Sequence, residues 1–484
     1  MKFIVKLFPE IMVKGPSVKK RMVRQLSNNL RRLLDRVDKS IEIKYFWDKL
    51  EIKTDDQFVE GVRRVLAQTP GIEYFVEAVQ YPLGDDLQAI ADTVAGYVVD
   101  SIEGKTFVVR VKRSGSHDFS STEAERFIGS VLCKVGNPKG VSLHHAEITV
   151  DIEIYQRELN IVTAKRAGLG GYPLGTQGEV LSLMSGGFDS TVASYLTMKR
   201  GLKTHFIFFN LGGAAHEIGV KQVALYLWSQ FGASHRVKFV TVPFEEVVTE
   251  IFNSTHPSYM GVTLKRLMLI ASERIADQME IDALVTGESV AQVSSQTLRN
   301  LAVIDQATDK LVLRPLATMH KQEIMAIADK IGTRHFAESM PEYCGVISQN
   351  PVISASFSRM DKEALRFDYT VLNHAVETAV TISVDKVIDD VTAMAHIEVL
   401  STVPENTVVI DIRAEDERVR ASLQMSDALT IPFYELNKTF AKLDQNRGYL
   451  LYCEKGVMSQ LHAQYLKDEG FENVRVYRPG QWVH

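Results

Sequence analysis

The chain has 484 residues, of which 45% are hydrophobic and 24% are charged, and it carries a formal net charge of −5. This length predicts several domains, and the ordinary globular composition excludes extensive disorder. The first 170 residues are slightly basic and the rest is acidic, so we expect any RNA contact in the N-terminal third.

The N-terminal segment is interrupted by charged residues and a proline too early for a signal peptide. No apolar run approaches the ~20 residues that a membrane span needs. We therefore expect a cytoplasmic protein that makes no membrane contact.

The first 80 residues predict a β-α-β-β-α-β order, which is typical of a ferredoxin-like module. The strands are expected at 1–8, 41–46, 50–54 and 72–80, and the helices at 17–36 and 56–67. The first helix is basic, and its cations fit an RNA-facing surface as well as an ordinary solvated one: Lys19, Lys20, Arg21, Arg24, Arg31 and Arg32. We assign residues 1–60 to this domain and 61–165 to a second unit that begins within the last helix of the first.

The second unit is predicted to contain helices at 84–102 and 122–135 and strands at 107–111, 146–154 and 158–164. The loop before the second helix groups basic residues with one aromatic ring, which suits phosphate contacts and base stacking: Lys112, Arg113, His117 and Phe119. Residues 107–121 resemble the centre of a THUMP domain, a module of tRNA-modifying enzymes, although a capped helix after a polar loop would look similar. The glycine-rich residues 166–176 predict a linker.

From residue 177 onward, strands and helices alternate, which predicts a doubly wound parallel sheet. The strands are expected at 180–184, 203–209, 236–242 and 282–286, and the helices at 190–200, 216–231 and 263–278. Ligands bind such sheets beyond the carboxyl ends of the strands. The first strand leads into the sequence SGGFDS at residues 185–190.

Two glycines in this hexapeptide let the backbone approach an anion, and the start of the following helix favours phosphate. No lysine follows, so the turn is not a P-loop. A serine- and glycine-rich turn without a ligand is the plain alternative. The hexapeptide resembles the signature of the PP-loop ATP pyrophosphatases, which implies adenylation with ATP and Mg²⁺.

That resemblance places Asp189 and Lys321 at the reaction and assigns nucleotide contacts to Leu183, Met184, Ser185, Gly186, Gly187, Ser190, Lys265, Gly287 and Gln296. Lys265 also fits a solvated lysine at a helix start. No metal ligand is assigned, although Asp189 is a candidate for Mg²⁺. We assign residues 177–395 to this adenylation domain, and we expect residues 355–400 to be a mostly helical, charged linker.

The chain has three cysteines and no C-x-x-C pair, which excludes a cysteine-rich zinc site and a secreted disulfide framework. Cys133 lies in an apolar pattern and is predicted to be core. Cys453 lies between a predicted strand at 449–452 and a helix at 460–469, where exposed amides and the helix dipole stabilise a thiolate. A buried structural cysteine is the alternative. Cys344 alone is an ordinary loop cysteine.

The segment around Cys453 resembles a rhodanese loop, which holds a cysteine persulfide. Asp411 and Arg413 match the early D-x-R strand of a rhodanese domain. We assign residues 404–484 to this rhodanese-like domain. Met458 stands where most such loops carry arginine, which favours a protein persulfide donor, such as a cysteine desulfurase, over thiosulfate. Beside a persulfide, Cys344 could release the product by forming a disulfide, if the two Cα atoms came within ~7 Å.

The order of these units, with MPEYCGV at 340–346 and CEKGVMS at 453–459, resembles the tRNA 4-thiouridine synthetases (ThiI) over essentially the whole chain. The resemblance implies that ATP adenylates uridine 8 of tRNA and that persulfide sulfur from Cys453 displaces AMP. It also implies sulfur transfer to a small carrier protein for thiamine thiazole synthesis.

Two other functions stay open at this point. One is a PP-loop enzyme that activates a small carbonyl compound for amidation, although no glutaminase unit is evident. The other is a noncatalytic RNA-binding sulfur carrier that uses only Cys453. The sequence also leaves open whether the chain forms a homodimer and which tRNAs it uses.

Overall fold

The computed structural model describes residues 1–211, 214–339, 350–387, 397–413, 427–453 and 457–479, together with residues 418, 423 and 425. Within these residues, no helix is both long enough and apolar enough to cross a membrane. The chain divides into two compact units, one formed by residues 1–177 with 199–201 and the other by 178–198 with 202–484.

One continuous sheet of eight strands runs through the first unit, whose residues are all described, in the order β2-β3-β1-β4-β8-β7-β5-β6. The strands are β1 (Lys2–Leu7), β2 (Glu42–Tyr45), β3 (Lys49–Lys53), β4 (Ile72–Pro82), β5 (Thr106–Ser114), β6 (Gly140–Val141), β7 (Ile148–Tyr155) and β8 (Glu158–Gly170). The long strands β4 and β8 pair antiparallel from Ile72 opposite Gly170 to Pro82 opposite Glu158. They join both halves of the unit.

The first half packs the helices α1 (Pro9–Met12), α2 (Pro16–Leu34) and α3 (Val59–Gln68) on the sheet. Helix α2 buries Leu26 and Leu30 and turns most of its basic side chains outward. The same core includes Val62, Leu66 and Phe75. The ferredoxin-like packing therefore continues beyond the predicted boundary at residue 60, because α3 and the start of β4 complete its core.

The second half packs α4 (Leu87–Ile102) and α5 (Ser121–Val135) against β5 and β7. Two predictions are wrong here. Cys133 is exposed, because α5 turns Ile128 and Leu132 toward the core and Cys133 away from it. Residues 166–170 are not linker but the end of β8.

The second unit begins with a sheet that has six strands within the described residues, in the order β13-β12-β9-β10-β11-β14. They are β9 (Glu179–Leu183), β10 (Lys203–Asn210), β11 (Lys238–Pro243), β12 (Ala283–Val285), β13 (Leu311–Leu313) and β14 (Val380–Ser383). All pairs are parallel except β11 with β14. The predicted doubly wound parallel sheet is confirmed, and β9 lies at its switch point between β10 and β12.

The helices of this sheet domain are α6 (Phe188–Lys199), α7 (Ala214–Leu227), α8 (Glu245–Ser254), α9 (Met260–Gln278), α10 (Leu298–Asp305), α11 (Lys321–Lys330), α12 (Arg334–Ser339), α13 (Phe357–Ala364) and α14 (Tyr369–Glu377). Met360 from α13 and Leu372 from α14 lie in the same core as Leu267 of α9. The expectation of a linker at 355–400 is therefore wrong for its first part, since α13, α14 and β14 belong to this domain.

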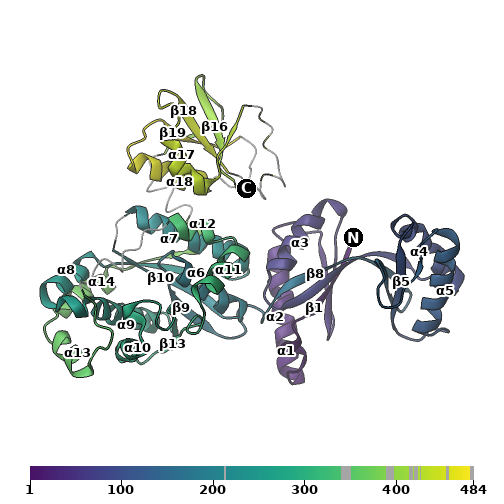
Figure 1. Ribbon diagram of the computed structural model, residues 1–484, viewed down its shortest axis with the longest axis horizontal. Helices are drawn as coiled ribbons and strands as arrows, with labels where there is room; N and C mark the ends of the chain where they lie inside the picture. The colour runs from purple at the N-terminus through teal and green to yellow at the C-terminus, as the bar shows by residue number, and fades with distance from the viewer. Residues whose placement is uncertain are drawn as a thin grey trace. The chain divides into compact units, whose positions relative to one another are not determined.

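The C-terminal module has a parallel sheet in the order β15-β19-β18-β16-β17, drawn toward yellow in Figure 1. Its described strands are β15 (Val399–Leu400), β16 (Thr407–Asp411), β17 (Leu429–Thr430), β18 (Gly448–Tyr452) and β19 (Val474–Tyr477), with the helices α17 (Phe433–Phe440) and α18 (Val457–Asp468).

Candidate functional site

The SGGFDS turn connects β9 to α6 at the switch point of the sheet, and its own side chains close it. The Ser185 N–H donates to Ser190 Oγ at 3.2 Å, and Ser190 Oγ donates to the Gly187 carbonyl at 3.3 Å. Gly186 has φ +82°, a conformation that favours glycine. A Cβ added to Gly187 would meet only Ser185 Oγ, at 3.7 Å. The turn therefore presents an open backbone surface at a helix start, which fits a polyphosphate.

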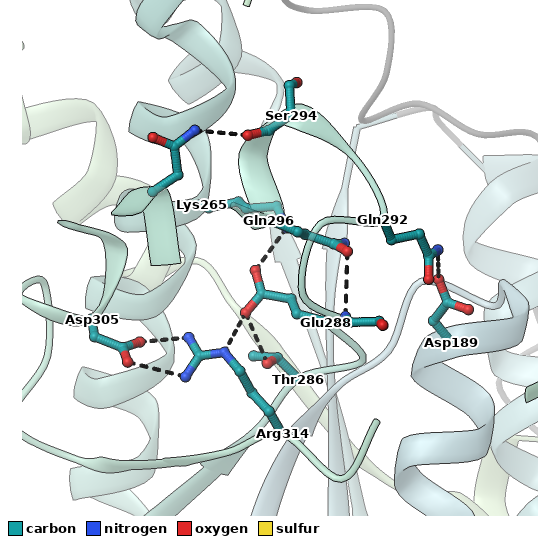
Figure 2. A network of polar contacts seen from close by, with 11 residues as sticks. Asp189, Lys265, Thr286, Glu288, Gln292, Ser294, Gln296, Asp305 and Arg314 are labelled. Carbon is teal, nitrogen blue, oxygen red and sulfur yellow. Dashed lines mark hydrogen bonds and ion pairs between the residues drawn. The ribbon is translucent and has the colours of Figure 1, made fainter. Parts of the chain in front are cut away.

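Asp189 is held from two sides by residues that are remote in sequence. Lys321 Nζ, at the start of α11, lies 2.8 Å from Asp189 Oδ1. Gln292 Nε2 donates to Asp189 Oδ2 at 2.7 Å (Figure 2). The structure thus brings together Asp189 and Lys321, which the sequence singled out separately. Sequence reasoning missed Gln292, which lies in the loop after β12.

Gly287 lets the end of β12 touch the start of α6. A Cβ at this position would lie 2.5 Å from the Asp189 carbonyl carbon and 2.6 Å from the Ser190 nitrogen. Real Cβ atoms do not approach backbone this closely, so any other residue would push β12 away from the turn. The predicted site residue Gly287 therefore has a steric reason to be glycine.

Lys265 of α9 is paired with a buried carboxylate that sequence reasoning did not single out. Lys265 Nζ lies 2.7 Å from Glu288 Oε1. Glu288 Oε2 accepts from Arg314 Nε at 2.8 Å and from Thr286 Oγ1 at 3.1 Å (Figure 2). Burial raises the pKa of Glu288, but the charges of Lys265 and Arg314 outweigh it and hold this pKa below its ordinary value. Glu288 is thus an anion between two cations.

The remaining predicted nucleotide contacts lie at the end of β9 and in the segment after β12. Leu183 ends β9, and the next residue, Met184, is buried and donates its N–H to the Ile207 carbonyl at 2.8 Å. Gln296 is buried, and its Oε1 accepts the Ser289 N–H at 3.3 Å. The side-chain oxygen of Gln296 therefore already stabilises the loop after β12.

His216 lies beside the turn and was also missed. Its Nε2 is 3.3 Å from the Ser185 carbonyl oxygen, and its ring packs edge-on against Phe208. Burial lowers the pKa of His216, so the ring is neutral at pH 7 and donates from Nε2.

Cys453 follows β18 and faces the first turn of α18. Its Sγ accepts the Ser459 N–H at 3.3 Å and lies 3.4 Å from Ser459 Oγ, and the residue is 7% exposed. A helix N-terminus that donates to sulfur stabilises a thiolate or a persulfide anion. Asp411 and Arg413 form a buried ion pair, with Nη2 to Oδ2 at 2.7 Å. Residues 454–456 and Cys344 lie outside the described residues.

The four predicted RNA contacts lie around the end of β5. Lys112 and Arg113 belong to this strand rather than to a loop, and Lys112 is 75% exposed. Arg113 Nη1 donates to the His117 carbonyl at 3.3 Å, and the rings of His117 and Phe119 are 5.7 Å apart. Phe119 is half-buried against the core, which leaves only part of its ring available for stacking.

Metal ligands do not gather in the part of the chain that the structure describes. No group of three or more histidine, cysteine, aspartate or glutamate side chains there could hold a metal ion. At the turn, both carboxylate oxygens of Asp189 have protein partners.

Comparisons with known families match four consecutive segments. The ThiI ferredoxin-like domain matches residues 2–76, the THUMP domain 85–163, the family "Thiamine biosynthesis protein (ThiI)" 175–369, and the rhodanese-like domain 398–481. The order is the one expected from the sequence.

Full-length relatives carry one name. Proteins called tRNA sulfurtransferase from Pseudomonas syringae pv. syringae (strain B728a) and Azotobacter vinelandii (strain DJ / ATCC BAA-1303) are each 49% identical, over 99% of this chain and 100% of theirs. The relative of that name from Tolumonas auensis is 48% identical over the same shares.

Two solved structures share the fold. A 4-thiouridine synthetase in complex with RNA and with bound ATP has a TM-score of 0.71 at 24% identity, covering 79% of this chain and 99% of its own. A protein from Pyrococcus horikoshii has a TM-score of 0.53 at 19% identity, covering 69% of this chain and 100% of its own.

The fold and the site together define a transferase that combines an adenylation domain with a rhodanese-like domain. The chain belongs to the tRNA sulfurtransferase (ThiI) family, which confirms the resemblance inferred from SGGFDS and the cysteine motifs.

Proposed function

We propose that this protein uses ATP to activate the C4 oxygen of uridine 8 in tRNA and replaces that oxygen with sulfur carried on Cys453, giving 4-thiouridine. The observation that carries the proposal is the SGGFDS turn with Asp189 held by Lys321 and Gln292, in the same chain as a thiol at a helix N-terminus. The shared name of the full-length relatives supports tRNA as the substrate.

ATP fits the open backbone of the SGGFDS turn, with its phosphates at the start of α6. Lys265 and Lys321 supply positive charge there, and backbone groups at Leu183 and Met184 meet the adenine. Mg²⁺ would neutralise phosphate charge during the transfer. Since the described residues form no metal cluster, phosphate oxygens would supply most of its ligands, with Asp189 beside them.

The first chemical step forms a bond between the uridine C4 oxygen and the α-phosphorus of ATP and releases pyrophosphate. The terminal sulfur of a Cys453 persulfide then attacks C4, and AMP leaves with the former C4 oxygen. The Cys344 thiolate attacks Cys453 Sγ, so that the electron pair of the broken sulfur–sulfur bond goes to the uridine sulfur. A cellular dithiol reduces the resulting Cys344–Cys453 disulfide.

The proposal includes two protein partners and a tRNA-binding surface. A cysteine desulfurase loads Cys453 with sulfane sulfur, and a small sulfur-carrier protein receives sulfur from it for thiamine thiazole synthesis. The tRNA contacts Lys112, Arg113, His117 and Phe119. ATP, tRNA and thiol reductants coexist in the cytoplasm, where we place the reaction.

The test incubates purified protein with ATP, unmodified tRNA and a persulfide donor. We expect pyrophosphate rather than phosphate, and one 4-thiouridine per tRNA by mass spectrometry. Pyrophosphate release with a small carbonyl compound and no RNA would support the amidating alternative instead. Persulfide formation on Cys453 without any pyrophosphate release would support a sulfur carrier.

A further inference from the structure

We infer that Glu288 is a positioning residue for ATP, because its carboxylate holds the ammonium of Lys265, to which the proposed function gives a phosphate contact, and the guanidinium of Arg314. This inference rests on the proposed function of the SGGFDS turn.

Glu288 connects three separate segments. Its Oε1 contacts Lys265 of α9, and its Oε2 contacts Arg314, which follows β13, and Thr286, which follows β12 (Figure 2). The Glu288 side chain is 9% exposed. A buried carboxylate with three donors is a rigid anchor, because any movement would leave a charge without a partner.

The backbone around Glu288 is fixed as firmly as its side chain. The preceding residue, Gly287, lies against the backbone of Asp189. The following residue, Ser289, donates its N–H to Gln296 and its Oγ to the Met319 carbonyl at 2.9 Å. The carboxylate is therefore anchored to the same strand end that borders the SGGFDS turn.

Charge explains why Lys265 needs this partner. An ammonium has three N–H donors, so its contact with Glu288 leaves donors for phosphate oxygens. Without the carboxylate, Lys265 and Arg314 would be two neighbouring cations with no anion between them. The flexible lysine side chain would then turn toward solvent, and the phosphate site would lose an oriented charge.

The experiment compares Glu288→Gln with the parent enzyme in pyrophosphate release dependent on tRNA. Glutamine keeps the size of the side chain and removes its charge. We expect the KM for ATP to rise about tenfold and kcat to change less than threefold, because phosphate binding is affected more than the chemical step. The matched control is Asp305→Asn, which removes the outer, half-exposed partner of the same Arg314 and is expected to leave both constants within twofold.

A double-mutant cycle with Lys265→Ala separates positioning from general structural support. If Glu288 acts through Lys265, Glu288→Gln adds less than a twofold increase in KM to the Lys265→Ala enzyme. Independent, multiplying effects would overturn the inference, as would an unchanged or lower KM in Glu288→Gln alone. Melting temperatures of all variants show whether each is folded, and a Glu288→Gln protein that does not fold is replaced by Glu288→Asp in the same cycle.

Failure of the proposed function looks different. In that case the parent enzyme itself releases no pyrophosphate with tRNA, whereas failure of the inference leaves the parent active and removes only the coupling between Glu288 and Lys265.

Discussion

The ammonium of Lys321 lies 2.8 Å from a carboxylate oxygen of Asp189, although 132 positions separate the two residues in the chain. The pair places a cation and an anion at the start of α6, where phosphate charge would develop. Loss of either charge leaves the other without its main partner in a partly buried site.

We expect Lys321→Ala to lower the rate of pyrophosphate release about 100-fold, since the ammonium would stabilise charge in the transition state. Single-turnover assays with tRNA and saturating ATP measure this. The control is Asp329→Asn on the same helix, which removes an exposed charge and should leave the rate unchanged. A Lys321→Ala enzyme with the parent rate would exclude Lys321 from the chemical step.

Gly287→Ala is expected to disrupt the site without removing any polar side chain. The new Cβ would meet the Asp189 backbone at 2.5 Å, and the collision should cost about 1–3 kcal/mol of the free energy of unfolding as well as most of the activity. Denaturant unfolding and pyrophosphate release measure the two effects. Gly96→Ala in α4, where no atom lies within 4 Å of the added Cβ, should be neutral or stabilising.

Cys453→Ser should separate activation from sulfur transfer. The serine oxygen cannot carry sulfane sulfur, so 4-thiouridine should be absent from tRNA by mass spectrometry, while pyrophosphate release persists. Cys133→Ser, at an exposed thiol, serves as the control and should give the parent level of 4-thiouridine. Undiminished 4-thiouridine in the Cys453→Ser enzyme would contradict the persulfide role.

Lys112→Ala should weaken tRNA binding and reduce its salt dependence by about one counterion, because an exposed lysine contacts phosphate without reading sequence. Binding isotherms at several salt concentrations measure the slope. The control is Lys105→Ala. Lys105 is an exposed lysine of the same module, but it precedes β5, whereas Lys112 lies near the far end of that strand. Equal slopes for the two variants would argue against a specific contact at Lys112.

Acid should destabilise the C-terminal module through His462. Burial lowers the pKa of His462 to about 4, with the charge of His335 acting in the same direction. Unfolding restores an ordinary histidine that binds a proton below pH 6.5, so the stabilising effect is complete above 6.5 and is lost as the pH falls toward 4. Between pH 7 and pH 5 this should cost about 2 kcal/mol.

Thermal unfolding of His462→Leu at both pH values measures this loss. Both ring nitrogens of His462 are without a hydrogen-bond partner among the described residues, so leucine removes no such contact. We expect a smaller change between pH 7 and pH 5 in this variant, whereas His374→Leu, at an exposed histidine, should keep the parent change. An unaltered pH dependence in His462→Leu would exclude His462 as the cause.

Local chemistry made some of the site predictable. The SGGFDS turn needs glycines and a helix start within six residues, and the Cys453 loop needs a strand end and a helix N-terminus. Both signals are short in sequence. Glu288, Gln292 and Arg314 gave no comparable signal, because their roles come from partners 23, 103 and 26 residues away.

The errors in the fold have similar physical causes. Strand β14 has four residues and pairs antiparallel with β11, so its place depends on a partner that periodicity does not reveal. Cys133 adjoins the apolar residues Val131 and Leu132, and a continuous apolar run conceals which face of a helix is buried.

The shared strands β4 and β8 determine how the N-terminal unit can be dissected. Lys2 of β1 is buried at their junction, 3.0 Å from both Glu51 of β3 and Glu158 of β8. Cutting the chain between the two modules would separate β4 from β8. The backbone groups of the remaining strand would be unpaired, and such an exposed strand edge promotes aggregation. The ferredoxin-like and THUMP modules thus form one compact unit, and a fragment meant for RNA-binding work has to keep residues 1–177 together.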